Sequence, residues 1–244
     1  MNLENVLNFI FPIKCGICGK IGLPICSDCE KLLKKHEINL IENEYIEIEK
    51  SIASKNIIID QENNYKLKNN KKQKINKKIK VQKIFLYKYD DIVRKLLINY
   101  KFNDASYLAD TFSYLIKNNK KIYDILKTYD IILPVPLHKK RKLERGYNQT
   151  ELIARKLGLI YENNCLVKVK NIKPQSQNDV EKRKTEIKDV FKIQNIEKIT
   201  NKKVLILDDI YTTGATAKEC IKTVSRATKN IGFVSIARDY MKYL

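Results

Sequence analysis

The feature that most restricts the fold is a stretch near the C-terminus, residues 203–216, which opens with a run of aliphatic residues. Val204 to Leu207 are consecutive apolar residues, typical of a strand buried on both faces, as in a parallel sheet. Asp208 and Asp209 follow at the strand end, where open α/β sheets hold their ligands. A short loop of small and hydroxylated residues then leads into an amphipathic helix predicted over 217–229. The stretch therefore predicts one strand–loop–helix unit of an α/β sheet.

The loop after the acidic pair is suited to phosphate. Its small residues leave backbone N–H groups free at a helix N-terminus, and Gly214 lets the backbone approach a ligand closely. Because carboxylates repel phosphate, Asp208 and Asp209 must face another part of the same ligand, and sugar hydroxyls suit them. A ribose carrying a 5′-phosphate satisfies both halves. The alternative is an ordinary buried strand followed by an Asp-rich turn.

The whole string resembles the signature of type I phosphoribosyltransferases, the motif that binds phosphoribosyl pyrophosphate (PRPP). The resemblance implies that Asp208 and Asp209 are the catalytic pair and hold the ribose 2′- and 3′-hydroxyls. It also implies a 5′-phosphate loop, with Mg²⁺ bound through oxygens of PRPP. The residues of that loop are Tyr211, Thr212, Thr213, Gly214, Ala215 and Thr216.

A second motif lies near the N-terminus, after a short amphipathic helix predicted over 2–11. Cys15 and Cys18 form one C-x2-C pair, and Cys26 and Cys29 form another seven residues later. Two residues between thiolates let both sulfurs converge on one metal ion. Paired disulfides are not expected in a cytosolic chain, and a redox C-x-x-C would stand beside a βαβ pattern. We therefore predict tetrahedral, structural Zn²⁺, with Ser27 capping a helix over 29–35.

The remaining cysteines and histidines are not predicted to bind metal. Cys165 and Cys220 lie in apolar company on predicted core elements and are expected to be buried thiols. His36 and His138 have no partner at metal-binding spacing.

Residues 37–80 differ in character from the rest. Carboxylates alternate with Ile and Tyr over 37–49, which could form a short strand, and residues 63–80 are dominated by Lys and Asn. A run of this kind cannot bury enough apolar surface to order itself, so a mobile linker or loop is expected.

The chain beyond residue 80 alternates strand and helix patterns. A strand is predicted over 84–89, a helix capped by Asp90 that ends near Lys101 and Phe102, and a second helix over 105–117. A buried strand over 130–138 breaks at two prolines, and a cationic turn over 139–145 leads to a helix over 150–157. A cationic strand end in the same sheet as a phosphate loop is where pyrophosphate would lie. Lys101, Arg141 and Arg145 are the candidate pyrophosphate residues, against the alternative of a solvated charge run.

Two further segments narrow the resemblance. Leu133-Pro134-Val135-Pro136-Leu137-His138, followed by Arg145-Gly146-Tyr147-Asn148-Gln149, is similar to the hallmark of the ComF family, and the four-cysteine module matches that family's zinc ribbon. Members are competence-associated, phosphoribosyltransferase-like proteins. The segment from Pro174 to Phe191 resembles the family's flexible hood over the active site, with Glu186 near the place of the usual Asn.

Composition leaves the partner open. The formal net charge is +20, which favours a polyanion such as nucleic acid, but Trp is absent and Gly scarce, the pattern of an A/T-rich genome that inflates lysine everywhere. No stretch approaches the ~20 apolar residues of a membrane span, and the first residues lack a basic signal-peptide region. We expect a cytoplasmic protein.

Together these patterns predict an α/β protein with a doubly wound, mostly parallel sheet flanked by helices, of the type I phosphoribosyltransferase kind. The expected parts are a helix and zinc module over 1–36, a linker or insertion over 37–80, and the phosphoribosyltransferase-like domain over 81–244. Three functions remain open. They are a phosphoribosyltransferase of unknown acceptor, a competence factor that binds single-stranded DNA or meets the DNA-uptake machinery, and a PRPP-sensing regulator without turnover.

Overall fold

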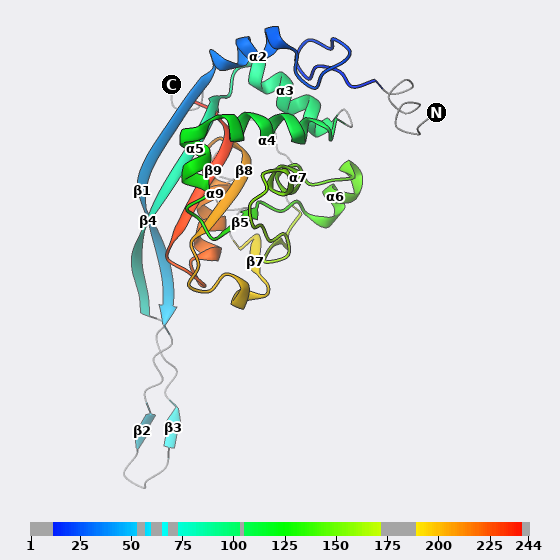
Figure 1. Cartoon of the computed structure of the whole chain (residues 1–244). Helices are drawn as coiled ribbons and strands as arrows, with labels where there is room; N and C mark the ends of the chain where they lie inside the picture. Colours follow the sequence, from blue (N-terminus) through cyan, green and yellow to red (C-terminus); the bar gives the residue numbers. More distant parts are fainter. Residues whose placement is uncertain are drawn as a thin grey trace.

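The chain folds as an α/β structure around one five-stranded sheet (Figure 1). The computed structural model describes residues 12–52, 57–59, 65–67, 73–102, 105–171 and 189–240. The strand order is β1-β4-β9-β8-β5; β4, β9, β8 and β5 are mutually parallel, and β1 runs antiparallel to β4. The predicted α/β class with a mostly parallel, helix-flanked sheet is confirmed. The strands are β1 (Glu37–Ile52), β4 (Gln73–Lys88), β5 (Ile131–Pro134), β8 (Val204–Tyr211) and β9 (Ile231–Arg238).

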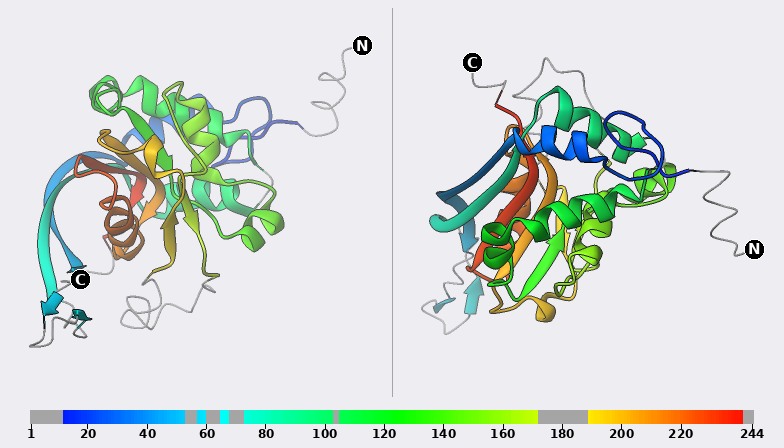
Figure 2. Two further views of the ribbon diagram at one scale, coloured as in Figure 1. Left: turned by 90° about the horizontal axis from the view of Figure 1, so that it is seen from below. Right: turned by 45° about the horizontal axis from the view of Figure 1, so that its top comes forward.

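Helices cover both faces of this sheet and enclose two apolar cores. One core lies beneath α3 (Asp91–Phe102), α4 (Leu108–Asn118), α5 (Lys120–Leu126) and α7 (Gln149–Lys156). The other lies beneath α9 (Ala215–Val224) and the antiparallel pair β6 (Leu166–Lys168) and β7 (Phe191–Ile193). Figure 2 shows α9, in brown-orange, and the green helices on opposite sides of the sheet. The remaining elements are α2 (Ser27–Lys34), α6 (Lys139–Arg145), η1 (Ile196–Lys198) and the pair β2 (Ile57–Ile59) and β3 (Tyr65–Leu67).

The aliphatic run of β8 is fully buried, as predicted. Because side chains alternate across a strand, Val204 and Ile206 pack beneath α9, whereas Leu205 and Leu207 pack beneath the other helices. The Asp90 cap of α3 is also confirmed, since its Oδ1 accepts from the Val93 backbone N–H at 3.2 Å.

The short strand expected over 37–49 is confirmed as part of β1, whereas the mobile linker or loop expected over 63–80 is wrong for residues 73–80, which belong to β4. β1 and β4 pair from Glu37–Tyr87 to Ile52–Gln73, so residues 73–80 belong to a long antiparallel ribbon (Figure 1). The lysine-rich strand is ordered by an acidic partner, as the Lys78–Glu47 ion pair at 3.3 Å illustrates. Most of residues 53–72 fall outside the described residues.

Three local predictions also need correction. Residues 139–145 form the helix α6, not a turn; His138 caps it by accepting from the Lys140 N–H, and Gly146 ends it with φ +79°. Ser27 lies inside α2, whose N-cap is Cys26 without a side-chain bond. α9 begins at Ala215, before the predicted start, and ends at Val224. The helix predicted over 2–11 lies outside the described residues.

The N-terminal cysteine module packs on the main core. The Gly16 carbonyl accepts from Asn99 of α3 at 2.6 Å, and the Lys14 carbonyl accepts from Tyr107 at 2.9 Å. A Cβ at Gly16 would lie within 3.0 Å of side-chain carbons of both Leu96 and Leu108. In the described part of the chain, every helix is too short or too polar to cross a membrane.

Gly16→Ala is therefore expected to destabilise the fold by about 1–3 kcal/mol, because the added methyl overpacks two buried leucines. Urea unfolding of the metal-loaded protein measures this, with the exposed Ser106→Ala as the control. An unchanged urea midpoint would show that Gly16 of the cysteine module does not pack tightly against α3 and α4.

Candidate functional site

The acidic pair lies at the carboxyl end of β8. Asp208 is buried at 9% exposure beneath the α9 face, next to Cys220, whereas Asp209 faces α3. There the Lys101 Nζ lies 2.7 Å from the Asp209 Oδ2, and both side chains are less than a fifth exposed. The structure thus brings Asp209 into contact with one of the predicted pyrophosphate residues.

Asp208 is held in an environment that favours its neutral form. Burial, and then the neighbouring Asp209 carboxylate, raise the pKa of Asp208 to about 7, against the opposite effects of the Asp209 N–H bond, Lys101 and Lys168. Its Oδ1 accepts from that N–H at 2.8 Å. Burial and Asp208 also raise the pKa of the Cys220 thiol. Asp208 is therefore close to half protonated near neutral pH.

Cations from separate segments surround the two acids. Burial lowers the pKa of Arg145; the field of Asp209 opposes this, and that of Arg141 adds to it. Burial and then Arg141 likewise lower the pKa of Lys168, in β6, and the field of Asp208 raises it. The predicted Lys101, Arg141 and Arg145 therefore share one electrostatic environment with Asp208 and Asp209.

Sequence reasoning missed Lys168. It follows two apolar residues on a three-residue strand, a pattern with no local sign of a binding site. Lys168 comes from the separate β6–β7 pair, and its electrostatic interaction with Asp208 joins residues that are distant in the sequence.

The Arg145 side chain is held by contacts with Gln149 and Phe102. Its Nη1 donates to the Gln149 Oε1 at 2.7 Å, and its guanidinium lies 5.1 Å from the centre of the Phe102 ring. The Gln149 Nε2 is buried and has no acceptor among the described residues. This amide therefore offers a donor beside the cation cluster.

The loop between β8 and α9 has open donors. Gly214 adopts φ +74° as the N-cap of α9. Within the described ranges, the N–H groups of Thr212, Thr213 and Gly214 have no acceptor, and the hydroxyls of Thr212, Thr213 and Thr216 have no partner. Together with the N–H groups at the start of α9, these are hydrogen-bond donors without an acceptor in the described ranges. They follow the acidic pair closely in the chain.

Tyr211 supports this loop from the core. Its hydroxyl accepts from the Lys83 Nζ at 3.0 Å, and its ring packs edge-on against Phe85 and Phe233. A Cβ at Gly214 would collide with the Tyr211 ring, so the loop requires glycine there for space as well as for φ. Lys83 is buried and also pairs with Glu44 of β1. The side chain of Tyr211 thus ties the loop to the β1–β4 ribbon.

The four predicted zinc ligands converge at the N-terminal end of the described chain. The sulfurs of Cys15, Cys18, Cys26 and Cys29 all lie within 4.8 Å of one another, and Cys18 and Cys26 are 3.8 Å apart. Tetrahedral Zn–S bonds of about 2.3 Å place sulfurs about 3.8 Å apart, whereas a disulfide needs about 2.05 Å. Burial raises the pKa of Cys15, but backbone N–H bonds from Cys18, Cys26 and Ile17 outweigh it and lower the pKa to about 6, whereas burial and the neighbouring cysteines raise the pKa of Cys29. The cluster could hold a metal ion, and its geometry suits structural zinc.

Cys165 and Cys220 are buried thiols, as predicted. The predicted hood over 174–191 lies outside the described residues except for its end at Asp189–Phe191.

The double substitution Cys15→Ser/Cys18→Ser is expected to reduce bound zinc from about one equivalent to none and to lower the melting temperature, because metal binding contributes folding free energy. Elemental analysis and thermal melts measure both. Cys165→Ala, which removes a buried thiol outside the cluster, should keep its zinc. Zinc retained by the double variant would refute the ligand assignment.

The acidic pair gives a pH prediction. Between pH ~4 and ~7 the folded protein keeps a proton on Asp208 that the unfolded chain has released, so rising pH lowers the free energy of unfolding by up to about 1.4 kcal/mol per unit. Asp208→Asn has no carboxyl group to titrate at this position. Its free energy of unfolding should therefore rise relative to that of wild type as the pH is raised from 5.5 to 8. Urea unfolding across this range measures the difference, with the exposed Asp124→Asn as control. A gain that does not change with pH would contradict the raised pKa.

Comparison with known proteins finds relatives that match part of the chain. The chain is 28% identical to the competence protein ComFC of Bacillus subtilis over 155 residues, which is 62% of each chain. It is 28% identical to competence protein F of Haemophilus influenzae over 54% of this chain and 61% of that protein. It is 30% identical to the ComFC of Streptococcus pneumoniae over 63% of this chain and 66% of that protein. The match spans less than two thirds of each relative's length, and no family model matches the chain.

Proposed function

Since this chain belongs to the ComF family, we propose that it binds PRPP as the Mg²⁺ complex, within a phosphoribosyltransferase-like fold, in the service of DNA uptake. The observation that carries the proposal is the set of unused donors from Thr212 to Thr216, beside an acidic pair and a cation cluster. One ligand that combines a sugar diol with phosphates at both ends satisfies all three groups. The names of the relatives support the link to competence.

Each group has a part in the proposed binding. The 5′-phosphate accepts from the loop N–H groups and hydroxyls at the start of α9. Asp209 accepts from a ribose hydroxyl, and Asp208 from the other in its ionised form. Lys101, Arg141, Arg145 and Lys168 neutralise the pyrophosphate, and Mg²⁺ arrives bound to PRPP oxygens, since Mg²⁺ usually binds through substrate phosphates.

The proposed reaction is pentosyl transfer. A nitrogen nucleophile forms a bond to C1 of the ribose while the bond from C1 to the pyrophosphate oxygen breaks, and pyrophosphate leaves with the electron pair. Positive charge develops at C1 and the ring oxygen, and the carboxylates beside the ribose stabilise it.

Binding without turnover is a second candidate function. The Lys101–Asp209 ion pair and the raised pKa of Asp208 favour it, because both reduce the negative charge available to an oxocarbenium-like transition state. A PRPP sensor of this kind would share the site but release no pyrophosphate.

Calorimetric titration with Mg-PRPP tests the site. Wild type is expected to give saturable heat, and Asp208→Ala/Asp209→Ala to bind at least tenfold more weakly, since it removes the groups assigned to the ribose. Asp124→Asn, an exposed acid on α5, should bind as wild type does. Absence of heat with folded, zinc-loaded wild type would refute PRPP binding altogether. With binding established, a pyrophosphate assay in the presence of mixed nucleobases separates transfer from sensing.

A further inference from the structure

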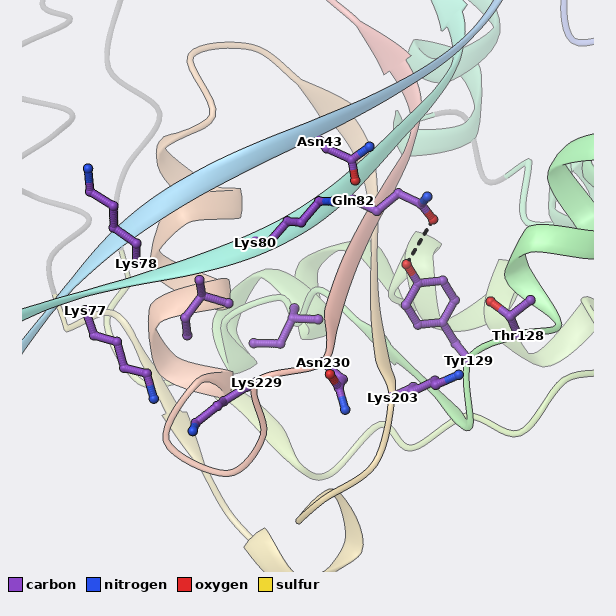
Figure 3. Close-up of a pocket in the computed structure, with 12 residues that line it drawn as sticks. Asn43, Lys77, Lys78, Lys80, Gln82, Thr128, Tyr129, Lys203, Lys229 and Asn230 are labelled. Atoms are coloured by element: carbon purple, nitrogen blue, oxygen red, sulfur yellow. Dashed lines mark hydrogen bonds between the residues drawn. The ribbon is translucent and has the colours of Figure 1, made fainter.

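Lys83 is a buried cation in an otherwise apolar row of β4. It is 3% exposed, and its neighbours on the same face of the strand, Val81 and Phe85, are fully buried. The preceding residue, Gln82, points to the opposite face, where its Oε1 accepts from the Tyr129 hydroxyl at 3.2 Å (Figure 3). Burying a charge in such a row costs free energy unless the charge is paired, so packing alone does not account for a lysine here.

Two contacts engage the Lys83 ammonium. Its Nζ donates to the Tyr211 hydroxyl at 3.0 Å and lies 5.0 Å from the centre of the Tyr211 ring, and it forms an ion pair with Glu44 of β1. Glu42, the residue directly opposite Lys83 in the ribbon, pairs instead with Arg238 at 2.6 Å. The fold thus brings the Lys83 charge to the tyrosine that leads into the loop between β8 and α9.

Arg238 contacts the same tyrosine from β9. The two residues are partners in the parallel pairing of β8 and β9, and the Arg238 guanidinium lies 5.8 Å from the centre of the Tyr211 ring. The Tyr211 carbonyl also accepts from the Asp239 N–H at 2.9 Å. The Tyr211 ring is therefore in contact with cations from β4 and β9, and each of these cations is paired with an acid of β1.

The Tyr211 side chain fills the turn that begins the loop. Gly214 lies three residues after Tyr211, and a Cβ at Gly214 would collide with the Tyr211 hydroxyl and ring. The hydroxyl that accepts from Lys83 is therefore the group against which the loop backbone packs. A hydroxyl held at one position holds the backbone of Thr212 and Thr213 in one arrangement, in which their N–H groups have no acceptor among the described residues.

We propose that Lys83 is a positioning residue for the 5′-phosphate and acts through Tyr211. Because it holds the Tyr211 hydroxyl under Gly214, the loop N–H groups are already arranged for phosphate, and binding does not have to order them. Its ammonium is the positive end of the Lys83–Glu44 pair and lies on the side of the loop, where it favours an anion. The inference rests on the proposed function, because it concerns the phosphate half of that site.

Calorimetric titration of the full, zinc-loaded chain with ribose 5-phosphate tests the proposal, with magnesium pyrophosphate as a second probe. Lys83→Met is expected to bind ribose 5-phosphate about tenfold more weakly than wild type, the effect of losing one hydrogen bond from a charged group. Its affinity for pyrophosphate should not change, because the cations assigned to that group come from α3 and α6. A general loss of structure would weaken the binding of both probes.

A second variant separates the tyrosine contact from folding. Tyr211→Phe keeps the ring against Gly214 but removes the oxygen that accepts from Lys83, so it should also bind ribose 5-phosphate more weakly. Since the two residues act through one contact, Lys83→Met/Tyr211→Phe should bind no more weakly than Lys83→Met alone. Lys83→Met should melt close to wild type, because its partner Glu44 is half exposed and stays hydrated.

The matched control is Lys127→Met. Lys127 also pairs with an acid, Asp124 at 2.6 Å, and also lies over a tyrosine ring, 5.5 Å from the centre of Tyr123. It is exposed at the end of α5 and contacts neither the loop nor Tyr211. This variant should bind both probes as wild type does.

The outcomes separate this inference from the proposed function. Equal affinity of Lys83→Met and wild type for ribose 5-phosphate would overturn the positioning role and leave PRPP binding standing. So would an equal loss for both probes, additive losses in the double variant, or a wild type that binds Mg-PRPP but not ribose 5-phosphate. A wild type that does not bind Mg-PRPP would overturn the proposed function and the inference together.

Discussion

The burial of the Asp208 carboxyl at the end of β8 is the constraint on which the rest of the site depends. This acid is shielded from water and next to a second acid, an arrangement that raises its pKa and disfavours its charged form. Three interactions oppose this cost. The Asp209 backbone N–H donates to Asp208, Lys101 forms an ion pair with Asp209, and the positive charge of Lys168 acts on Asp208. These groups come from both faces of the sheet, so the acidic pair is where the two cores meet. A sugar that donates hydroxyl hydrogen bonds to the pair would replace the water that folding removed.

The metal module is connected to this site through α3. Gly16 lies against Leu96, and Asn99 bonds the Gly16 carbonyl, so the cysteine loop rests on the helix that carries Lys101. Asn99, which contacts the module, therefore stands close in this helix to Lys101, the cation that pairs with Asp209. A closed four-thiolate site supplies no open coordination position, and its effect on chemistry can only be structural. Its position explains why a small module far from β8 in sequence belongs to the same unit.

Local patterns predicted the parts whose causes are local. The aliphatic run before Asp208, the Asp90 cap and the C-x2-C pairs each depend on residues a few positions apart, and each could be read directly. The ribbon could not, because the lysines of β4 gain order only from carboxylates of β1 about 30 residues earlier, as in Lys78–Glu47. Lys168 could not be predicted for the same reason. Its role depends on the electrostatic interaction between this residue of β6 and Asp208, and the residues next to Lys168 in the sequence give no sign of that interaction.

β4 connects the two ends of the sheet. Gln82 accepts from the Tyr129 hydroxyl at the end of the sheet where β8 and β9 begin, and the next residue, Lys83, donates to Tyr211 beneath the loop between β8 and α9. Their side chains point to opposite faces because they are neighbours on one strand. A shift of β4 near Gln82 would thus move the buried Lys83 that contacts Tyr211, whose ring lies against Gly214. Coupling between the ends would require a difference in affinity for two positions of this strand. Lys83 is the residue through which such a difference would pass, because it is buried and binds both Glu44 of the ribbon and the tyrosine of the loop.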